Sequence, residues 1–222
     1  MSLWLRVVLS FAFRISCYGA MVYALLWAEA RPAPPSLPDA VLDVVPYVPW
    51  VDANNYLLWL FAYLPVGLWL LKTDAERFIR YMISAGLVAL LRGACVLATG
   101  LGPVHGADLN AGLTAQARDE AFWRIANPFS FFVPGGSAQV YLTKDLFFSG
   151  HTATTFLLLL YVWRFPRLRA VMGVGHVMVV VSLFLSHLHY TIDVIGAYAI
   201  TFSVFFLREG DLKGLLSGGS RP

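Results

Sequence analysis

The chain has 222 residues, of which 59% are hydrophobic and 13% charged, and its formal net charge is +3. A mean hydropathy of +0.68 is far from what soluble globular domains show, so the composition predicts an integral membrane protein. The net charge is small and is spread between loops, which argues against nucleic acid as a partner.

Six apolar stretches have about the length that a membrane-spanning helix needs, which is roughly 20 residues. In chain order they are Val7–Ala28, Tyr56–Leu71, Phe78–Ala98, Leu146–Trp163, Val171–Ser186 and Ile192–Leu207. These runs are continuously apolar instead of alternating with a period of two, which favours helices over barrel strands. We therefore predict an all-α, polytopic membrane protein in which residues 1–222 form one bundle of six transmembrane helices.

The first stretch allows two interpretations. Arg6, an apolar run and small residues around Glu29 also imitate a secretory signal with its cleavage site. We expect the stretch to be retained as a span, in which Arg14 either faces a neighbouring helix or snorkels toward the cytoplasmic surface. Cys17 and Cys95 fall inside spans and are predicted to be buried thiols, so they indicate nothing about redox compartment.

Positive charges are concentrated in alternate connections, which predicts the orientation of the bundle. The first connection carries Asp39, Asp43 and Asp52 against Arg31 alone. The N-terminus, the second and fourth connections and the tail carry Arg6, Lys72, Arg77, Arg80, Arg164, Arg167, Arg169, Arg208, Lys213 and Arg221. By the positive-inside rule the second group is cytoplasmic and the odd-numbered connections are exoplasmic.

The third connection, residues 100–145, is predicted to be an exoplasmic loop. Within it, Arg118–Gly136 indicates a short amphipathic helix at the membrane interface, followed by an apolar segment that ends at Pro and Gly. Two roles are open, a lid over a lipid entrance or simple interfacial anchoring by aromatic side chains. The aromatic residues concerned are Phe122, Trp123, Phe129, Phe131 and Phe132.

Titratable side chains gather at the outer ends of the last spans. The stretch "SHLHYTIDV" places His189 and Asp193 four residues apart, so on a helix they share one face and the carboxylate can hold the imidazole. The stretch "FFSGHT" places His151 at the outer end of the fourth span. Arg92 lies in the outer half of the third span, where a cation is costly unless it meets a polar cavity or an anion. His187 has no partner at helical spacing and is predicted to be structural or at the substrate's edge.

This set of residues fits attack on a phosphorus ester by an imidazole. A histidine oriented by an aspartate is a good nucleophile, and a second histidine can protonate the leaving oxygen. An arginine and a helix N-terminus can hold the phosphoryl oxygens. An isolated histidine in a span is more often structural, but the conjunction of these groups favours catalysis. A reading outside catalysis is a transition-metal carrier that uses the three histidines and Asp193, although we expect no metal and no cofactor.

The two histidine motifs resemble a known family. "SGHT", followed some forty residues later by "HYTIDVIGAY", is similar to the paired motifs of the sphingomyelin synthase group within the type 2 phosphatidic acid phosphatase superfamily. The similarity runs from Asp145 to Leu207, and Asp145 itself matches an aspartate that the family carries before its first catalytic histidine. Arg92, Thr99 and Pro103 resemble the family's third-span motif more loosely.

The resemblance implies six spans and transfer of a phospho-headgroup between lipids through a phosphohistidine at the exoplasmic surface. Carried over, His189 is the nucleophile, Asp193 its orienter and His151 the acid and base. The wider superfamily's Lys-rich phosphate motif is missing, and Leu188 stands where close relatives often carry an acid. Phosphate therefore needs other partners, and the candidates are Arg92, Lys144 and the amides of Ser149 and Gly150.

Two enzymatic functions share the first chemical step. The expected partners are membrane lipids, either a glycerophospholipid donor with ceramide or a similar acceptor, or a lipid phosphate that is hydrolysed by water as a phosphatase substrate. The donor headgroup, the acceptor lipid and the oligomeric state are left open by the sequence. A bacterial inner membrane is favoured as the location over a Golgi or endoplasmic reticulum type of membrane.

Overall fold

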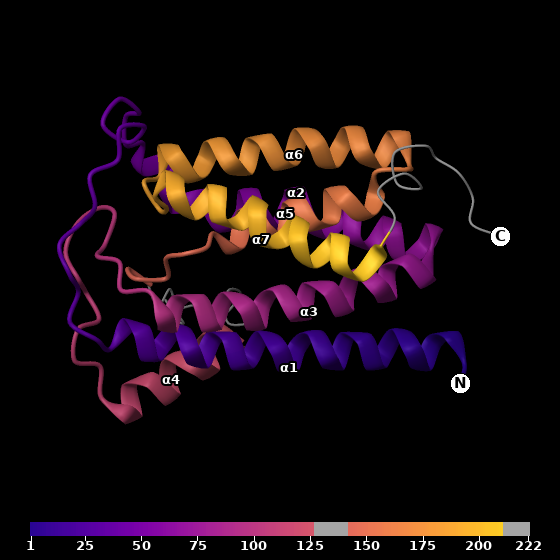
Figure 1. Ribbon diagram of the computed structural model, residues 1–222, viewed down its shortest axis with the longest axis horizontal. Helices are drawn as coiled ribbons and strands as arrows, with labels where there is room; N and C mark the ends of the chain where they lie inside the picture. Colours follow the sequence, from indigo (N-terminus) through magenta and orange to yellow (C-terminus); the bar gives the residue numbers. More distant parts are fainter. Residues whose placement is uncertain (127–141, 211–222) are drawn as a thin grey trace.

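The computed structural model describes residues 1–126 and 142–210 of the chain, and Figure 1 shows their arrangement. These residues form seven helices and no strand, which confirms the predicted all-α bundle. Five of them, α1, α2, α3, α6 and α7, are long and apolar enough to cross a membrane. The helices are α1 (Leu3–Glu29), α2 (Pro49–Thr73), α3 (Ala75–Ala98), α4 (Ala115–Ala126), α5 (Gly150–Val162), α6 (Pro166–Leu185) and α7 (Thr191–Glu209).

The fourth predicted span, Leu146–Trp163, starts too early. The apolar helix α5 begins at Gly150 and has 13 residues, so it is only about 20 Å long. The preceding segment is non-helical because other helices hold its backbone. The Asp193 carboxylate accepts the Phe147 N–H, and the Arg92 guanidinium donates to the Phe148 carbonyl.

The helices lie roughly parallel to the long axis of the molecule (Figure 1). α1 packs against α3 and α4, α2 packs mainly against α6, and α5 contacts α6, α7 and α3. Four connections, residues 30–48, 99–114, 142–149 and 186–190, meet at one end, which we call the loop end (Figure 1). The N-terminus and the turns between α2 and α3 and between α5 and α6 lie at the opposite end.

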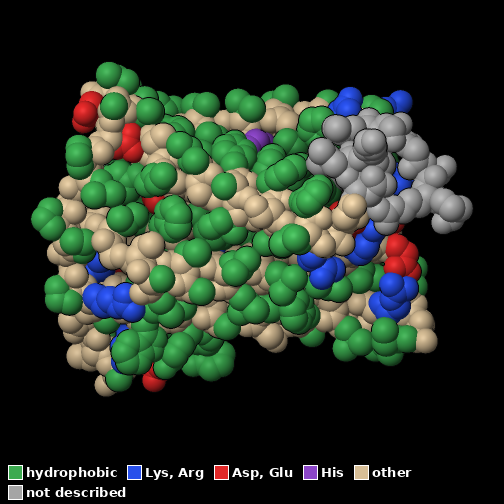
Figure 2. Space-filling model, in the orientation of Figure 1, with side chains coloured by type: hydrophobic (Ala, Val, Ile, Leu, Met, Phe, Trp, Pro, Cys, Tyr) green, Lys and Arg blue, Asp and Glu red, His purple; other side chains and the backbone are tan. Residues whose placement is uncertain are grey.

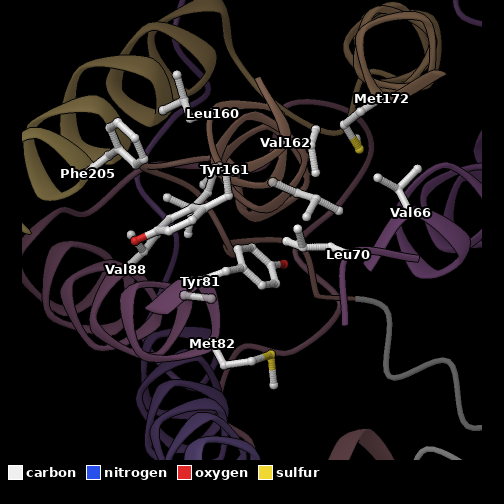
Figure 3. Close-up of a cluster of buried hydrophobic side chains, with 14 of the residues drawn as sticks. Val66, Leu70, Tyr81, Met82, Val88, Leu160, Tyr161, Val162, Met172 and Phe205 are labelled. Atoms are coloured by element: carbon white, nitrogen blue, oxygen red, sulfur yellow. The ribbon is translucent and has the colours of Figure 1, made fainter. Parts of the chain in front are cut away.

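Buried side chains from five helices form the centre of the bundle. Figure 3 shows Leu70, Tyr81, Tyr161, Met172 and Phe205 packed together, and each is at most 3% exposed. Within a bilayer such contacts stabilise a bundle by van der Waals packing, because lipid is as apolar as the side chains. Small residues bring α1 and α3 close: a Cβ on Gly93 would lie 3.2 Å from the Met21 Cα atom.

Hydrophobic side chains cover most of the face seen in Figure 2, as expected for a surface that contacts lipid. α4 lies against the loop-end half of α1, where the Arg118 guanidinium is 4.0 Å from the Trp27 ring centre. Trp123 of α4 is 70% exposed. A helix is therefore present over Ala115–Ala126 within the predicted segment, and its location at the membrane interface stays a prediction. The remainder of the predicted segment, with Phe129, Phe131 and Phe132, lies outside the described residues.

Candidate active site

His189 and Asp193 lie at the N-terminal end of α7. The chain leaves α6 at Ser186 and enters α7 at Thr191, so His189 belongs to a short connection while Asp193 lies in the first helical turn. The His189 Nδ1 atom is 3.2 Å from the Asp193 Oδ2 atom, and Asp193 is fully buried. Since an ionised carboxylate only accepts hydrogen bonds, Nδ1 carries the proton. The Nε2 lone pair of His189 is then available for attack on an electrophile.

Backbone groups on both sides hold the Asp193 carboxylate. Its Oδ2 atom also accepts the Tyr190 N–H at 3.0 Å, and its Oδ1 atom accepts the Phe147 N–H at 3.0 Å. Both oxygens are therefore fixed before any substrate arrives. This network joins α7 to the segment that precedes α5, and so it couples the two histidine motifs.

His151 is the second residue of α5 and lies beside His189. The centroids of the two imidazole rings are 6.4 Å apart, and the edge of the Trp59 ring from α2 packs on His151 at 5.6 Å. Among the described residues, no side chain or backbone group makes a hydrogen bond with the His151 ring. Its nitrogen atoms are thus available to exchange a proton with a ligand.

Arg92 and the N-terminus of α5 complete the group. The Arg92 Nε atom donates to the Phe148 carbonyl at 2.8 Å, and its Nη2 atom donates to the Asp145 carboxylate. The guanidinium lies against Gly150, where a Cβ atom would be 3.0 Å from Nε. Glycine at this position therefore lets a buried cation approach the start of a helix, whose dipole already favours an anion.

The first amides of α5 differ in their availability. The Ser149 N–H donates to the Asp193 carbonyl at 3.1 Å, so it is occupied. The Ser149 hydroxyl caps the helix by accepting the Thr152 N–H at 3.3 Å. Within the described part of the chain, the amides of Gly150 and His151 have no acceptor. These two amides, with Arg92 beside them, can bind the oxygens of a phosphoryl group.

Comparison with known proteins shows what the chain is similar to. Residues 144–209, which contain both histidine motifs, match the family described as PAP2 superfamily C-terminal. Human phosphatidylcholine:ceramide cholinephosphotransferase 1 is 28% identical over 225 residues, which cover 91% of this chain and 52% of the human protein. The rat enzyme of that name is 28% identical over 222 residues, covering 91% of this chain and 51% of its own length. Human sphingomyelin synthase-related protein 1 is 29% identical over 180 residues, which cover 77% of this chain and 43% of that protein.

The chain is similar to sphingomyelin synthases over most of its length, and its residues 144–209 match the PAP2 C-terminal family. It spans about half the length of the curated relatives it matches. This agrees with the resemblance found in the sequence motifs, and the matched region coincides with α5, α6 and α7. The part of the chain that carries His151, His189 and Asp193 is therefore the part that matches the family model.

Lys144 is the predicted site residue that the structure does not bring to the others. Its ammonium group donates to both Asp108 carboxylate oxygens at 2.6 Å and to the Arg31 carbonyl at 2.7 Å. These bonds use all three of its donors, and its side chain is 4% exposed. Buried Glu29 accepts the Lys144 backbone N–H at 2.5 Å. Lys144 therefore fastens the loop end to α1, and we do not include it in a phosphate site.

The remaining predicted residues lie together or have structural partners. Asp145 pairs with Arg92 and is within electrostatic range of His189, and partial burial raises the pKa of the Asp145 carboxyl despite the guanidinium beside it. His187 is held away from the pair, because its Nε2 atom is 2.9 Å from the Val45 carbonyl. A structural role for His187, one of the two predicted from the sequence, fits this contact.

Two residues that contact the histidine motifs were not predicted from the sequence. Trp59 packs on His151 and donates from its indole N–H to Thr154 on the same helix at 2.9 Å. Asp39, in the first connection, accepts the Thr191 N–H at 2.6 Å and the Thr191 hydroxyl at 2.8 Å, two residues after His189. An acid next to proline in a long loop has no spacing signal that points to a partner 152 residues away.

Replacing Asp39 with asparagine should weaken the candidate site without removing a proposed catalytic group. Burial acts to raise the pKa of Asp39, but hydrogen bonds from Thr191, Leu42 and Val41 outweigh it and lower the pKa. The carboxylate therefore stabilises the fold above its ordinary pKa of about 4, and this contribution is lost as the pH falls through the lowered value. We expect D39N to lower the turnover rate about tenfold, the loss of roughly one charge-assisted hydrogen bond.

Asp43 provides a matched control in the same loop, because it is exposed and its side chain makes no hydrogen bond within the described residues. D43N should keep the parent rate. Thermal unfolding of D39N should also depend less on pH below about 4 than that of the parent protein. Equal rates for D39N and D43N would show that Asp39 does not position His189.

Proposed function

We propose that the protein transfers a phospho-headgroup from a glycerophospholipid to ceramide or a similar acceptor lipid, through a phosphohistidine on His189. The observation that carries this proposal is the His189–Asp193 hydrogen bond beside a second imidazole at the start of α5. The names of the relatives, phosphatidylcholine:ceramide cholinephosphotransferases, support the lipid classes.

In the first half-reaction, the His189 Nε2 atom forms a bond to the donor's phosphorus. The bond from phosphorus to the diacylglycerol oxygen breaks, and His151, as imidazolium, gives its proton to that oxygen. Asp193 stabilises the positive charge that develops on the His189 ring. The negative charge of the bound phosphodiester favours the protonated form of His151 before the step.

In the second half-reaction, the acceptor's hydroxyl oxygen attacks the phosphorus. Neutral His151 takes the hydroxyl proton, the new oxygen–phosphorus bond forms, and the phosphorus–Nε2 bond breaks. His189 and His151 thereby return to their starting protonation states. The Gly150 and His151 amides and the Arg92 charge stabilise the phosphoryl oxygens in both steps.

Incubation of the purified full chain with headgroup-labelled phosphatidylcholine, with and without ceramide, tests the proposal. We expect a labelled phosphosphingolipid that forms only when ceramide is present. Release of water-soluble labelled phosphocholine without a labelled lipid product would show that water is the acceptor and that the protein is a hydrolase of the donor. Absence of both products, across donors with choline, ethanolamine and glycerol headgroups, would refute the proposal.

We also propose that the loop end faces the exoplasmic side. The support is that His151 and His189 lie at the end opposite the N-terminal Arg6 and the two short turns, where Arg and Lys concentrate. Single cysteines at the exposed positions Ala107 and Arg167, made after Cys17 and Cys95 are removed, report on the two ends. In intact cells a membrane-impermeant thiol reagent should label the cysteine at 107 and spare that at 167. The reverse pattern would place the site on the cytoplasmic side.

A further inference from the structure

Arg14 is a partly buried cation with no anionic partner in the described residues. It lies near the middle of α1, far from either end of a helix that spans the membrane. Its Nη1 atom is buried and makes no hydrogen bond within residues 1–126 and 142–210, and the guanidinium carbon is 5.8 Å from the centre of the Tyr18 ring. The buried Nη1 atom does not snorkel to a surface, so within the described residues only the Tyr18 ring compensates the cost of this charge in the membrane.

The position of Arg14 connects it to the candidate active site. Arg14, Tyr18 and Met21 occupy one stripe of α1 at spacings of four and three residues. Met21 lies at the end of this stripe that is nearer the loop end. Its sulfur accepts a hydrogen bond from the Arg92 Nη1 atom at 3.6 Å. Tyr18 lies within electrostatic range of Arg14 and also of Arg92 and Asp145. The stripe therefore descends from the phosphate-binding groups by about 10 Å along α1, two helical turns.

A guanidinium has five donors and no acceptor, so the missing partner must be an acceptor. In a two-chain lipid whose phosphorus lies beside His189, the polar atoms below the phosphorus are the carbonyl oxygens that link the acyl chains. A lipid in the bilayer can reach this part of α1, because the Arg14 and Tyr18 side chains are partly exposed and the neighbouring Ile15 is 65% exposed. The lipid can thus present its linkage carbonyls to this side of the bundle.

We propose that Arg14 and Tyr18 bind the acyl-linkage carbonyl oxygen of a two-chain lipid and so set the depth at which its polar end meets the histidines. Two lipids can supply this oxygen, the ester of the glycerophospholipid donor and the amide of a ceramide-like acceptor. The proposal rests on the proposed function for the identity of these lipids, but carbonyl recognition is a binding property that needs no turnover.

Lipid-binding measurements on the full chain with the H189A substitution separate lipid recognition from catalysis. The probes are diester phosphatidylcholine with its diether analogue, which lacks both carbonyls, and ceramide with its N-alkyl analogue, which lacks the amide carbonyl. We expect H189A protein to bind at least one carbonyl lipid about tenfold more tightly than its carbonyl-free analogue. Adding R14Q should abolish that preference. The pair of lipid probes that shows this difference in affinity identifies which lipid supplies the carbonyl.

Arg6 gives a matched control on the same helix, since it pairs with Glu76 near the helix start. R6Q should preserve the preference, and R14K, which keeps a cationic donor, should retain part of it if R14Q proves unstable. Equal binding of both members of each pair by H189A protein, or a preference that survives R14Q, would overturn the inference. Failure of the proposed function would look different: the unmutated chain would produce no phosphosphingolipid while the carbonyl preference persisted.

Discussion

Replacing His189 with alanine is expected to abolish headgroup turnover, with a loss of at least about 10⁴-fold, because the variant lacks the nucleophile. The bundle should remain folded. Asp193 keeps its hydrogen bonds from the Phe147 and Tyr190 amides without the imidazole, so its buried charge is not left without partners. Initial rates with labelled phosphatidylcholine and ceramide, and the thermal unfolding temperature, measure the two effects separately.

His187 supplies the control for this experiment, because it lies two residues away and contacts a carbonyl of the first connection. Its φ of 49° lies in the left-handed region, which asparagine tolerates better than most residues. H187N should therefore fold and retain most of the activity. If H189A kept more than about one hundredth of the parent rate, His189 would not be the nucleophile.

Helix positions in this bundle follow from hydropathy, since a membrane requires long apolar runs. The contact between His189 and Asp193 follows from their spacing, and the proximity of His151 follows from counting spans and finding both motifs at one end. The start of α5 could not be predicted in the same way. Leu146, Phe147 and Phe148 are as apolar as the helix that follows, and what keeps them out of it is hydrogen bonding to Arg92 and Asp193 on other helices.

Polar pairs between distant loops account for what sequence reasoning assigned wrongly or missed. Lys144 carries the charge that a phosphate site needs, but Asp108, 36 residues earlier, takes its ammonium group. Asp39 and Thr191 are likewise joined across the loop end. Charge and residue type indicate which side chains can bind an anion, whereas three-dimensional pairing decides which of them are still available.

Asparagine at position 193 should lower turnover by about 10³- to 10⁴-fold, since it preserves the size of the side chain but not its acceptors. Three donors converge on this carboxylate: the Phe147 N–H on Oδ1, and the Tyr190 N–H and the His189 Nδ1–H on Oδ2. An amide offers one acceptor oxygen and one donor group, so either orientation directs an NH₂ group at a donor. The unfavourable contact falls on the Phe147 N–H in one orientation and on the His189 and Tyr190 donors in the other.

The two orientations predict different defects, and both reduce the rate. With the amide NH₂ toward His189, the imidazole loses the charge that stabilises its cation and is driven to the other tautomer, which leaves no lone pair on Nε2. With the NH₂ toward Phe147, the segment that carries Ser149 and the start of α5 shifts.

D193N should therefore accumulate little acid-labile label after incubation with headgroup-labelled donor, whereas the parent chain should accumulate phosphohistidine. D193E moves the carboxylate by one methylene and should restore part of the rate if charge is the main contribution. Near-normal turnover and labelling in D193N would show that another group orients His189.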